Sequence, residues 1–174
     1  IRLDGELVTM SDRIPMTRAG YDKIKAELER LHTVELPKIL ERLAAARAEG
    51  DLTENAEYEG AQESRRIMEA RIAALRDKLA RAVLIDPSKA PSDTVAFGTT
   101  VRVRDLDLDD EEEITLVGAG EEDYDRGRYL FTSPLGQGLA GHKVGDRVEI
   151  PVPQGTLRFE ILEIRPMAAD AEDG

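Results

Sequence analysis

The stretch EGDLTENAEY, residues 49–58, contains the side chains of this chain that are best suited to chemistry. Asp51 and Glu54 are three residues apart, so they project from one side if a helix begins here, and Glu57 continues that side. Two carboxylates held close together can share a divalent cation, because hard cations such as Mg²⁺ take oxygen ligands. Since so few ligands cannot complete an octahedral shell, we expect weak metal binding unless another molecule supplies the rest.

The same spacing has a purely structural interpretation. Asp51 followed by Glu54 is a capping-box arrangement, in which Asp51 accepts an amide hydrogen bond and Glu54 reaches back to the start of the helix. Both acids also suit the positive end of a helix dipole. On spacing alone capping is the favoured interpretation, because a D-x-x-E pattern is common.

Charge and composition limit the kinds of partner. Lys and Arg number 24 against 36 Asp and Glu, which gives a net charge of −12 at pH 7. This balance argues against broad adhesion to nucleic acid or to an anionic membrane, so any contact with RNA or DNA must be local or be arranged by a partner. The absence of cysteine excludes disulfides, Cys-ligated zinc and thiol nucleophiles. With only His32 and His142, a His-rich metal site is disfavoured.

No stretch predicts a membrane segment. No apolar run approaches the roughly 18 residues of a spanning helix, and the opening residues 1–15 lack the central apolar block of a signal peptide. We therefore expect a cytoplasmic protein with no membrane partner. The sequence begins with Ile1 rather than Met, so we expect an incomplete or processed N-terminus.

Composition divides the chain into five segments. An N-terminal extension at 1–16 precedes residues 17–85, which are rich in Ala, Leu, Glu and Arg. The Pro- and Ser-containing stretch 86–93 reads as a linker. Residues 94–166 show short alternating runs separated by glycines, and the acidic tail 167–174 is expected to fray.

Residues 17–85 predict two helices. Thr17 is a candidate N-cap, and Pro37 should kink or restart the first helix because it lacks an amide donor. Narrow apolar stripes among charged residues are typical of a coiled-coil seam. They consist of Tyr21, Ile24, Leu28, Leu31, Leu36, Leu40 and Leu43 in the first helix, and of Met68, Ile72, Leu75 and Leu79 in the second.

The short separation between the helices predicts an antiparallel hairpin with an acidic tip at residues 50–58. Residues 51–82, at roughly 1.5 Å of rise each, would make an arm of about 45 Å. Near the turn we expect the seam to narrow to small residues, namely Ala44, Ala45, Ala46, Ala48 and Ala56.

The pattern of residues 94–166 predicts a small α+β domain. Its expected strands are 95–103, 113–119, 128–133, 146–152 and 156–164, with a short glycine-weakened helix or loop in 134–145. The acidic run DLDLDDEEE, residues 105–113, is interpreted as a solvated hairpin loop, the alternative being an acidic face toward a basic partner.

Four motifs together carry a family resemblance. MTRAGYDKIKAELERL (16–31), EGDLTENAEY (49–58), FGTTVRV (97–103) and SPLGQGLAGHKVGD (133–146) resemble, in collinear order, the Gre transcript-cleavage factors of bacteria, most closely the GreA branch. The resemblance implies an α+β protein with an N-terminal antiparallel coiled-coil hairpin, which enters the secondary channel of RNA polymerase, and a C-terminal FKBP-like domain, which docks outside.

The resemblance also implies a mechanism. Asp51 and Glu54 correspond to the family's tip acids, which would complete the coordination of a second Mg²⁺ shared with RNA polymerase and help position the attacking water. The substrate would be the nascent RNA 3′ end of a backtracked elongation complex. Two-metal hydrolysis needs both the attacking and the leaving oxygen stabilised. The chain would then be a monomeric accessory factor that stimulates cleavage by the polymerase and is not itself an enzyme.

Three neighbouring residues are candidates for supporting the tip acids. Asn55 could orient the carboxylates through its amide or merely occupy the first helical turn, and Glu57 continues the acidic side. Tyr58 could help position Asp51 and Glu54, or RNA, or be an ordinary aromatic on the helix flank.

Three basic residues are candidates for contact with RNA. Arg47, one turn before the tip, could touch an RNA phosphate or belong to a solvated face. Arg65 and Arg66 could add a basic patch, although salt bridges within the helix explain many such residues. Acidic and amide residues that follow the NAEY motif (Glu59, Gln62 and Glu63) favour weak binding and short cleavage fragments.

Two other functions remain open from the residues. An inhibitor on the same scaffold would occupy the channel without activating hydrolysis, and the Asp51–Glu54 pair disfavours it. A coiled-coil adaptor without cleavage activity would use both domains for protein contacts, and its tip acids would be dispensable.

Overall fold

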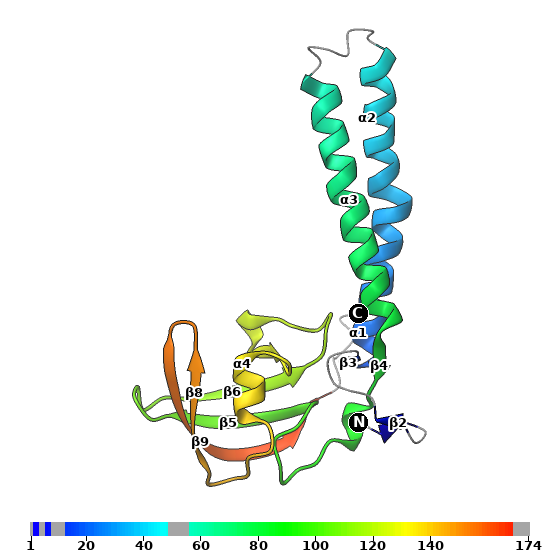
Figure 1. The fold of residues 1–174 in the computed structure, drawn as a ribbon. Helices are drawn as coiled ribbons and strands as arrows, with labels where there is room; N and C mark the ends of the chain where they lie inside the picture. The colour runs from blue at the N-terminus through cyan, green and yellow to red at the C-terminus, as the bar shows by residue number, and fades with distance from the viewer. Residues whose placement is uncertain (1, 4–5, 8–12, 49–55, 169–174) are drawn as a thin grey trace. The chain divides into compact units, whose positions relative to one another are not determined.

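The computed structural model describes residues 2–3, 6–7, 13–48 and 56–168 (Figure 1). The chain divides into two compact units, one formed by Ile1–Arg13 and Tyr21–Ala82, and the other by Ile14–Gly20 and Val83–Gly174. Within the described ranges, no helix is both long enough and apolar enough to cross a membrane. The first unit also contains β1 (Arg2–Leu3) and β2 (Glu6–Leu7), which pair antiparallel.

The predicted helical hairpin is confirmed. Its first arm consists of α1 (Arg18–Arg30), the π-helical turn η1 (Leu31–Glu35) and α2 (Leu36–Ala48). Its second arm is α3 (Ala56–Ala80), which runs back beside α2 (Figure 1). The 25 residues of α3 correspond to about 37 Å of helix. The expected arm of about 45 Å counted residues 51–82, of which 51–55 lie outside the described residues and 81–82 follow the end of α3.

The π-turn changes the register of the seam. Buried positions advance from Ile24 to Leu31, then by eight residues to Ile39, and then to Leu43 and Ala46. In η1 the Leu36 amide donates to the carbonyl of Leu31, five residues back, so this turn holds more residues than an α-helical one. The prediction of Leu40 in the seam is therefore wrong.

Exposure shows which residue replaces Leu40. The side chain of Leu40 is 40% exposed, whereas Ile39 is only 9% exposed and lies in the seam. Of the alanines predicted to form the seam, Ala46 is buried, whereas Ala44, Ala45, Ala48 and Ala56 are exposed. Its buried counterpart in α3 is Ala61.

Pro37 is the second residue of α2, which follows η1 without a gap. The wider turn lies just before this proline, which has no amide to donate. Within and beside the turn, the Thr33 hydroxyl donates to the Glu29 carbonyl at 2.8 Å, and Arg30 pairs with Glu35 at 3.0 Å. A π-turn therefore takes the place of the predicted break.

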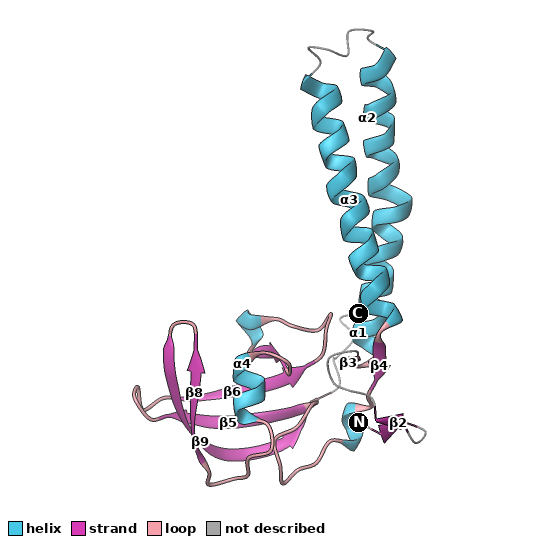
Figure 2. Ribbon diagram, viewed as in Figure 1, coloured by secondary structure: helices cyan, strands magenta, loops and turns pink. Residues whose placement is uncertain are grey.

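The C-terminal unit is built on a five-stranded sheet in the order β7-β6-β5-β9-β8 (Figure 2). Strands β6 and β7 pair parallel, and the other neighbours pair antiparallel. The strands are β5 (Thr99–Asp105), β6 (Glu111–Val117), β7 (Arg128–Leu130), β8 (Arg147–Val152) and β9 (Gly155–Pro166). The five predicted strands and the mixed α+β class are confirmed, with shifted ends.

One face of this sheet carries the core. Alternating strand residues such as Val101, Ile114 and Phe159 are buried together with Leu135 and Leu139 of α4 (Pro134–Leu139). Ser133 caps α4 by accepting a hydrogen bond from the Gly136 amide at 3.2 Å. The short helix predicted in 134–145 therefore forms despite its glycines.

The acidic run 105–113 is only partly a loop. Residues 106–110 connect β5 to β6, but Glu111 and Glu113 belong to β6. Arg102 pairs with Glu111 at 3.0 Å, and Arg165 pairs with Glu113 at 2.7 Å. Cross-strand pairing of opposite charges thus draws the end of the acidic run into the sheet.

The start of α1 belongs to the C-terminal unit. Strand β3 (Ile14–Met16) pairs with β4 (Ala82–Leu84) in a two-stranded sheet. The Gly20 amide donates to the Thr17 hydroxyl at 3.1 Å, which confirms Thr17 as the N-cap, and this hydroxyl donates to the Glu121 carboxylate. Two short 3₁₀ turns, η2 (Pro87–Lys89) and η3 (Tyr124–Arg126), complete the unit.

Candidate functional site at the end of the hairpin

The described residues of the predicted site belong to the end of α2 and the first half of α3. Asp51, Glu54 and Asn55 lie outside the described residues, in the segment 49–55 that connects α2 to α3. Because α2 ends at Ala48 and α3 begins at Ala56, that segment joins the two helices at the end drawn uppermost in Figure 1. We call this the connecting end of the hairpin.

Arg47 and Tyr58 meet across the hairpin at the connecting end. The guanidinium carbon of Arg47, in the last turn of α2, lies 5.7 Å from the centroid of the Tyr58 ring, within the range of a cation–π contact. The phenol oxygen of Tyr58 accepts a hydrogen bond from Nε2 of Gln62 at 2.9 Å. We call these three residues the Tyr58 clamp.

The clamp changes the electrostatics of the phenol. Hydrogen bonding from Arg47, and secondarily from Gln62, lowers the pKa of Tyr58, because both donors stabilise the phenolate. The sequence suggested roles for Arg47 and Tyr58 separately but missed Gln62. Its only signal is the four-residue spacing that places Tyr58 and Gln62 on one helix face.

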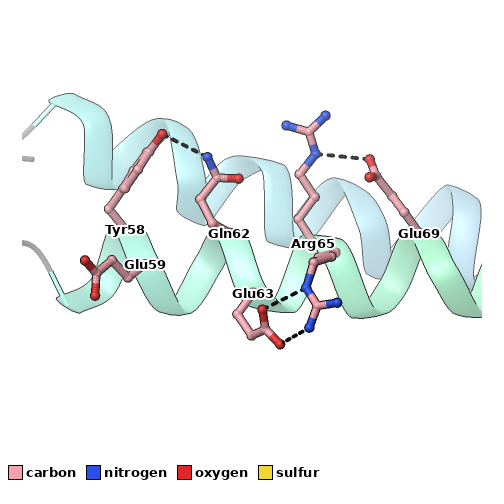
Figure 3. Close-up of a pocket in the computed structure, with 7 residues that line it drawn as sticks. Tyr58, Glu59, Gln62, Glu63, Arg65 and Glu69 are labelled. Atoms are coloured by element: carbon pink, nitrogen blue, oxygen red, sulfur yellow. Dashed lines mark hydrogen bonds and ion pairs between the residues drawn. The ribbon is translucent and has the colours of Figure 1, made fainter.

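A shallow hollow of ≈ 490 Å³ runs along α3 beside the clamp. Figure 3 shows Tyr58, Gln62, Arg65 and Glu69 following one side of the helix, with Glu59 and Glu63 on another. Both predicted RNA-contacting arginines of α3 are paired here, because Arg65 bonds Glu69 at 3.0 Å and Arg66 bonds Glu63 at 2.6 Å.

These ion pairs match the structural alternative for Arg65 and Arg66. The hydrogen bond from Arg66 lowers the pKa of the Glu63 carboxyl. Exposed pairs of this kind stabilise a helix only slightly, but they compete with any outside anion for the guanidinium groups. The positive charges of Arg65 and Arg66, which the sequence suggested for contact with RNA, are thus partly neutralised within α3.

Glu57 lies exposed in the first turn of α3, together with Glu59. Negative charge at this position is favourable because the helix dipole is positive at its N-terminus. A stabilising role at the helix start therefore accounts for Glu57 without any ligand.

The donor set suits a hard cation but is incomplete. Within residues 13–48 and 56–168, no group of three or more His, Cys, Asp or Glu side chains could hold a metal ion. Asp51 and Glu54 offer the carboxylate oxygens that Mg²⁺ prefers, yet two side chains leave most of an octahedral shell unfilled.

Comparisons with known proteins cover nearly the whole chain. Residues 14–84 match the family model described as "Transcription elongation factor, N-terminal", and residues 90–166 match "Transcription elongation factor, GreA/GreB, C-term". Transcription elongation factor GreA of Thermodesulfovibrio yellowstonii is 50% identical over 89% of this chain and 98% of its own length. GreA of Prosthecochloris aestuarii is 48% identical with the same coverage.

Among solved structures, GreA factor homolog 1 (Gfh1) of Thermus thermophilus is similar at 26% identity, over 88% of this chain and 99% of that one, with a TM-score of 0.42. The sequence matches carry the assignment. A helical hairpin and a small α+β domain, each matched by its own model, make up a transcription elongation factor. The chain belongs to the GreA/GreB family.

Members of this family act on RNA polymerase during elongation. They stimulate the transcript cleavage that is intrinsic to the polymerase and are not enzymes in their own right. The family and the accessory role predicted from the sequence are thereby confirmed.

Proposed function

We propose that Asp51 and Glu54 form the acidic tip through which this chain stimulates cleavage of backtracked RNA 3′ ends. The observation that carries the proposal is the antiparallel pairing of α2 with α3, whose ends at Ala48 and Ala56 assign residues 49–55 to the end of the hairpin. A tip of this kind can be offered to another protein's active centre.

The chemistry follows from the donor set. Mg²⁺ bound between the tip and the polymerase would stabilise negative charge on the attacking and leaving oxygens. Asp51 and Glu54 would each contribute a carboxylate oxygen to that ion, and either could accept a hydrogen bond from the water that attacks the phosphodiester. The polymerase would supply the remaining ligands.

The shape of the connecting end suits insertion into the secondary channel of RNA polymerase. Its seam consists of two small side chains, Ala46 at 4% and Ala61 at 0% exposure. Small residues let two helix backbones approach closely, so this end of the hairpin is slim. The length of α3, about 37 Å, supports reach into an enclosed centre.

Contact with RNA is assigned mainly to Arg47. Among the described residues its guanidinium lies over the Tyr58 ring, whereas Arg65 and Arg66 are each engaged by a glutamate. One positive group near the tip fits weak holding of a short RNA 3′ segment. Asn55 and Glu57 are proposed as supporting residues. We further propose that the factor is monomeric and works in the cytoplasm, where its polymerase is found.

The decisive experiment adds the purified protein to a stalled, backtracked bacterial elongation complex in the presence of Mg²⁺. Release of short 3′ RNA fragments is expected, and Asp51→Asn with Glu54→Gln should abolish release while polymerase binding persists. A matched control is Asp77→Asn with Glu59→Gln, which makes the same chemical changes within α3 and should leave release intact. The protein alone should not cleave RNA.

Two outcomes contradict the proposal. Full activity of the Asp51→Asn, Glu54→Gln variant would remove the metal-sharing role of the tip. Polymerase binding without fragment release by the unmodified protein would indicate a channel-occupying inhibitor or an adaptor.

A further inference from the structure

Among the described residues, the connecting end of the hairpin has little apolar packing to hold its two helices together. Farther from this end the seam contains Ile39, Leu43 and Ile72, but here it is reduced to Ala46 and Ala61. Burial of an alanine methyl group contributes much less than burial of a branched side chain, because the stabilisation follows the apolar area removed from water. Other contacts must therefore fix the spacing of the last turns.

The Tyr58 clamp supplies such a contact. Arg47 is the residue before the last residue of α2, and Tyr58 is the third residue of α3, so their cation–π contact joins both helices at the connecting end. Gln62, one turn further along α3, bonds the phenol oxygen at 2.9 Å and sets the direction of the ring (Figure 3). The half-buried ring is thus held from both helices.

We propose that the Tyr58 clamp positions the tip acids: it fixes the distance between the two helix ends from which residues 49–55 depart. The inference rests on the proposed function of Asp51 and Glu54. A connection with both ends anchored loses less conformational freedom when its carboxylates meet a metal ion, so less of the binding free energy is spent on ordering. Tyr58 and Gln62 are positioning residues, and neither touches the metal.

A clamp differs from an RNA-stacking platform in what it requires of Tyr58. Stacking on a base uses the face of the ring, so phenylalanine would serve equally well. The clamp requires the hydroxyl, because Gln62 and Arg47 hold the ring through it. Tyr58→Phe should therefore have at least the effect of Gln62→Leu, since it removes the hydroxyl on which both donors act.

The test measures cleavage of the backtracked complex as a function of Mg²⁺ concentration. Tyr58→Phe and Gln62→Leu should each raise the Mg²⁺ concentration for half-maximal cleavage about fivefold, the equivalent of one net hydrogen bond. The cleavage rate at saturating Mg²⁺ and the affinity for polymerase should be retained. The double variant should be no worse than Tyr58→Phe alone, because Gln62 acts through the hydroxyl that Tyr58→Phe already lacks. Glu59→Gln is the matched control, because Glu59 lies on a different side of α3 from Tyr58 and Gln62 (Figure 3).

A second measurement needs no polymerase. Amide hydrogen exchange of the segment 56–62 in the free protein should accelerate in Tyr58→Phe and in Gln62→Leu, and by clearly more than in Glu59→Gln, which removes only a favourable charge from the first turn of α3. Equal exchange in all four proteins would overturn the clamp.

The outcomes separate this inference from the function on which it rests. If Asp51→Asn with Glu54→Gln abolishes cleavage while Tyr58→Phe and Gln62→Leu match the unmodified protein at every Mg²⁺ concentration, only the clamp is overturned. If Tyr58→Ala lowers the saturated rate while Tyr58→Phe changes neither that rate nor the Mg²⁺ concentration for half-maximal cleavage, Tyr58 is an RNA platform and the clamp is again overturned. Full activity without the tip acids overturns both proposals.

Discussion

Thr17 caps helix α1 and donates the same hydroxyl to the carboxylate of Glu121, which lies 104 residues away in sequence. Both side chains are nearly inaccessible, at 4% exposure for Thr17 and 3% for Glu121. A buried carboxylate needs a donor, and the start of a helix offers a favourable field for its negative charge. The first turn of α1 is thereby fixed to the loop that follows β6.

Replacement of Thr17 by valine should lower the free energy of unfolding by about 2 kcal/mol or more, because it removes the cap and leaves Glu121 without that donor. Serine keeps the hydroxyl, so Thr17→Ser should cost less than about 1 kcal/mol. Urea denaturation of the two variants measures the difference. Equal stabilities would show that the hydroxyl contributes nothing.

Two helical glycines should respond in opposite directions to alanine. A methyl group at Gly60 meets open space, so Gly60→Ala should stabilise α3 by about 0.5–1 kcal/mol. A Cβ at Gly20 would lie 2.7 Å from the backbone oxygen of Ala119, so Gly20→Ala should destabilise the protein. Thermal unfolding of both variants tests the prediction, and a higher Tm for Gly20→Ala would contradict the close approach.

The π-turn makes a prediction about two adjacent residues. Ile39→Ala should cost about 2–4 kcal/mol because it leaves a cavity in the seam. Leu40→Ala should cost about 1 kcal/mol or less, since that side chain is 40% exposed. Denaturant unfolding compares them directly, and the reverse order would restore the regular register expected from the sequence.

The pKa of Tyr58 should be measurably low, since Arg47 and Gln62 both donate to its phenol oxygen. Difference titration of tyrosinate absorbance, unmodified protein minus Tyr58→Phe, should show a midpoint below the ordinary value of about 10. Arg47→Gln should raise that midpoint more than Gln62→Leu, because Arg47 contributes the larger effect.

The sign of the linked stability follows from that depressed pKa. The folded state releases the Tyr58 proton more readily than the unfolded state. The contribution of this ionisation to the free energy of unfolding is therefore complete above the pKa of the unfolded state and is lost as the pH falls through the pKa of the folded state. At neutral pH the ionisation of Tyr58 should contribute nothing to stability. A midpoint at the ordinary pKa would contradict the hydrogen bonds to the phenol.

Freeing the arginines of α3 should strengthen contact with RNA. Glu63→Gln with Glu69→Gln removes the partners of Arg66 and Arg65. Cleavage stimulation should then fall more steeply with salt, by about one unit in the slope of log activity against log salt, because additional phosphates are neutralised. Glu59→Gln is the control for loss of acidic charge, and a slope unchanged from that control would exclude Arg65 and Arg66 from the RNA path.

Periodicity predicted the elements well and their register less well. Narrow apolar stripes and alternating runs depend on local backbone geometry, so the hairpin and the five strands could be predicted from spacing. Leu40 was placed in the seam because heptad counting assumes an unbroken α-helix. A kink or restart was expected at Pro37, but the apolar spacing does not show that a π-turn adds a residue just before it.

Functional and buried polar residues could likewise be predicted only in part. The acids of the connecting segment were recognisable from their motif, but the roles of Gln62 and Glu121 arise from partners that only the fold brings near. Glu121 sits in the acidic sequence GEED, which gives no sign that one of these carboxylates is buried. Arg65 and Arg66 look available in the sequence, and their engagement depends on the side-chain rotamers of Glu69 and Glu63.

The π-turn also determines where this chain tolerates a change of length. Loss of one residue from Leu31–Glu35 would convert η1 to an ordinary α-turn and bring Ile39 to seven residues after Leu31, so every hydrophobic partner in the hairpin would be kept. The same loss between Ile39 and Ala46 would turn the remainder of α2 by about 100° and carry Arg47 away from Tyr58. Single-residue gaps among related sequences should therefore occur mainly within Leu31–Glu35 and be rare between Ile39 and Ala46.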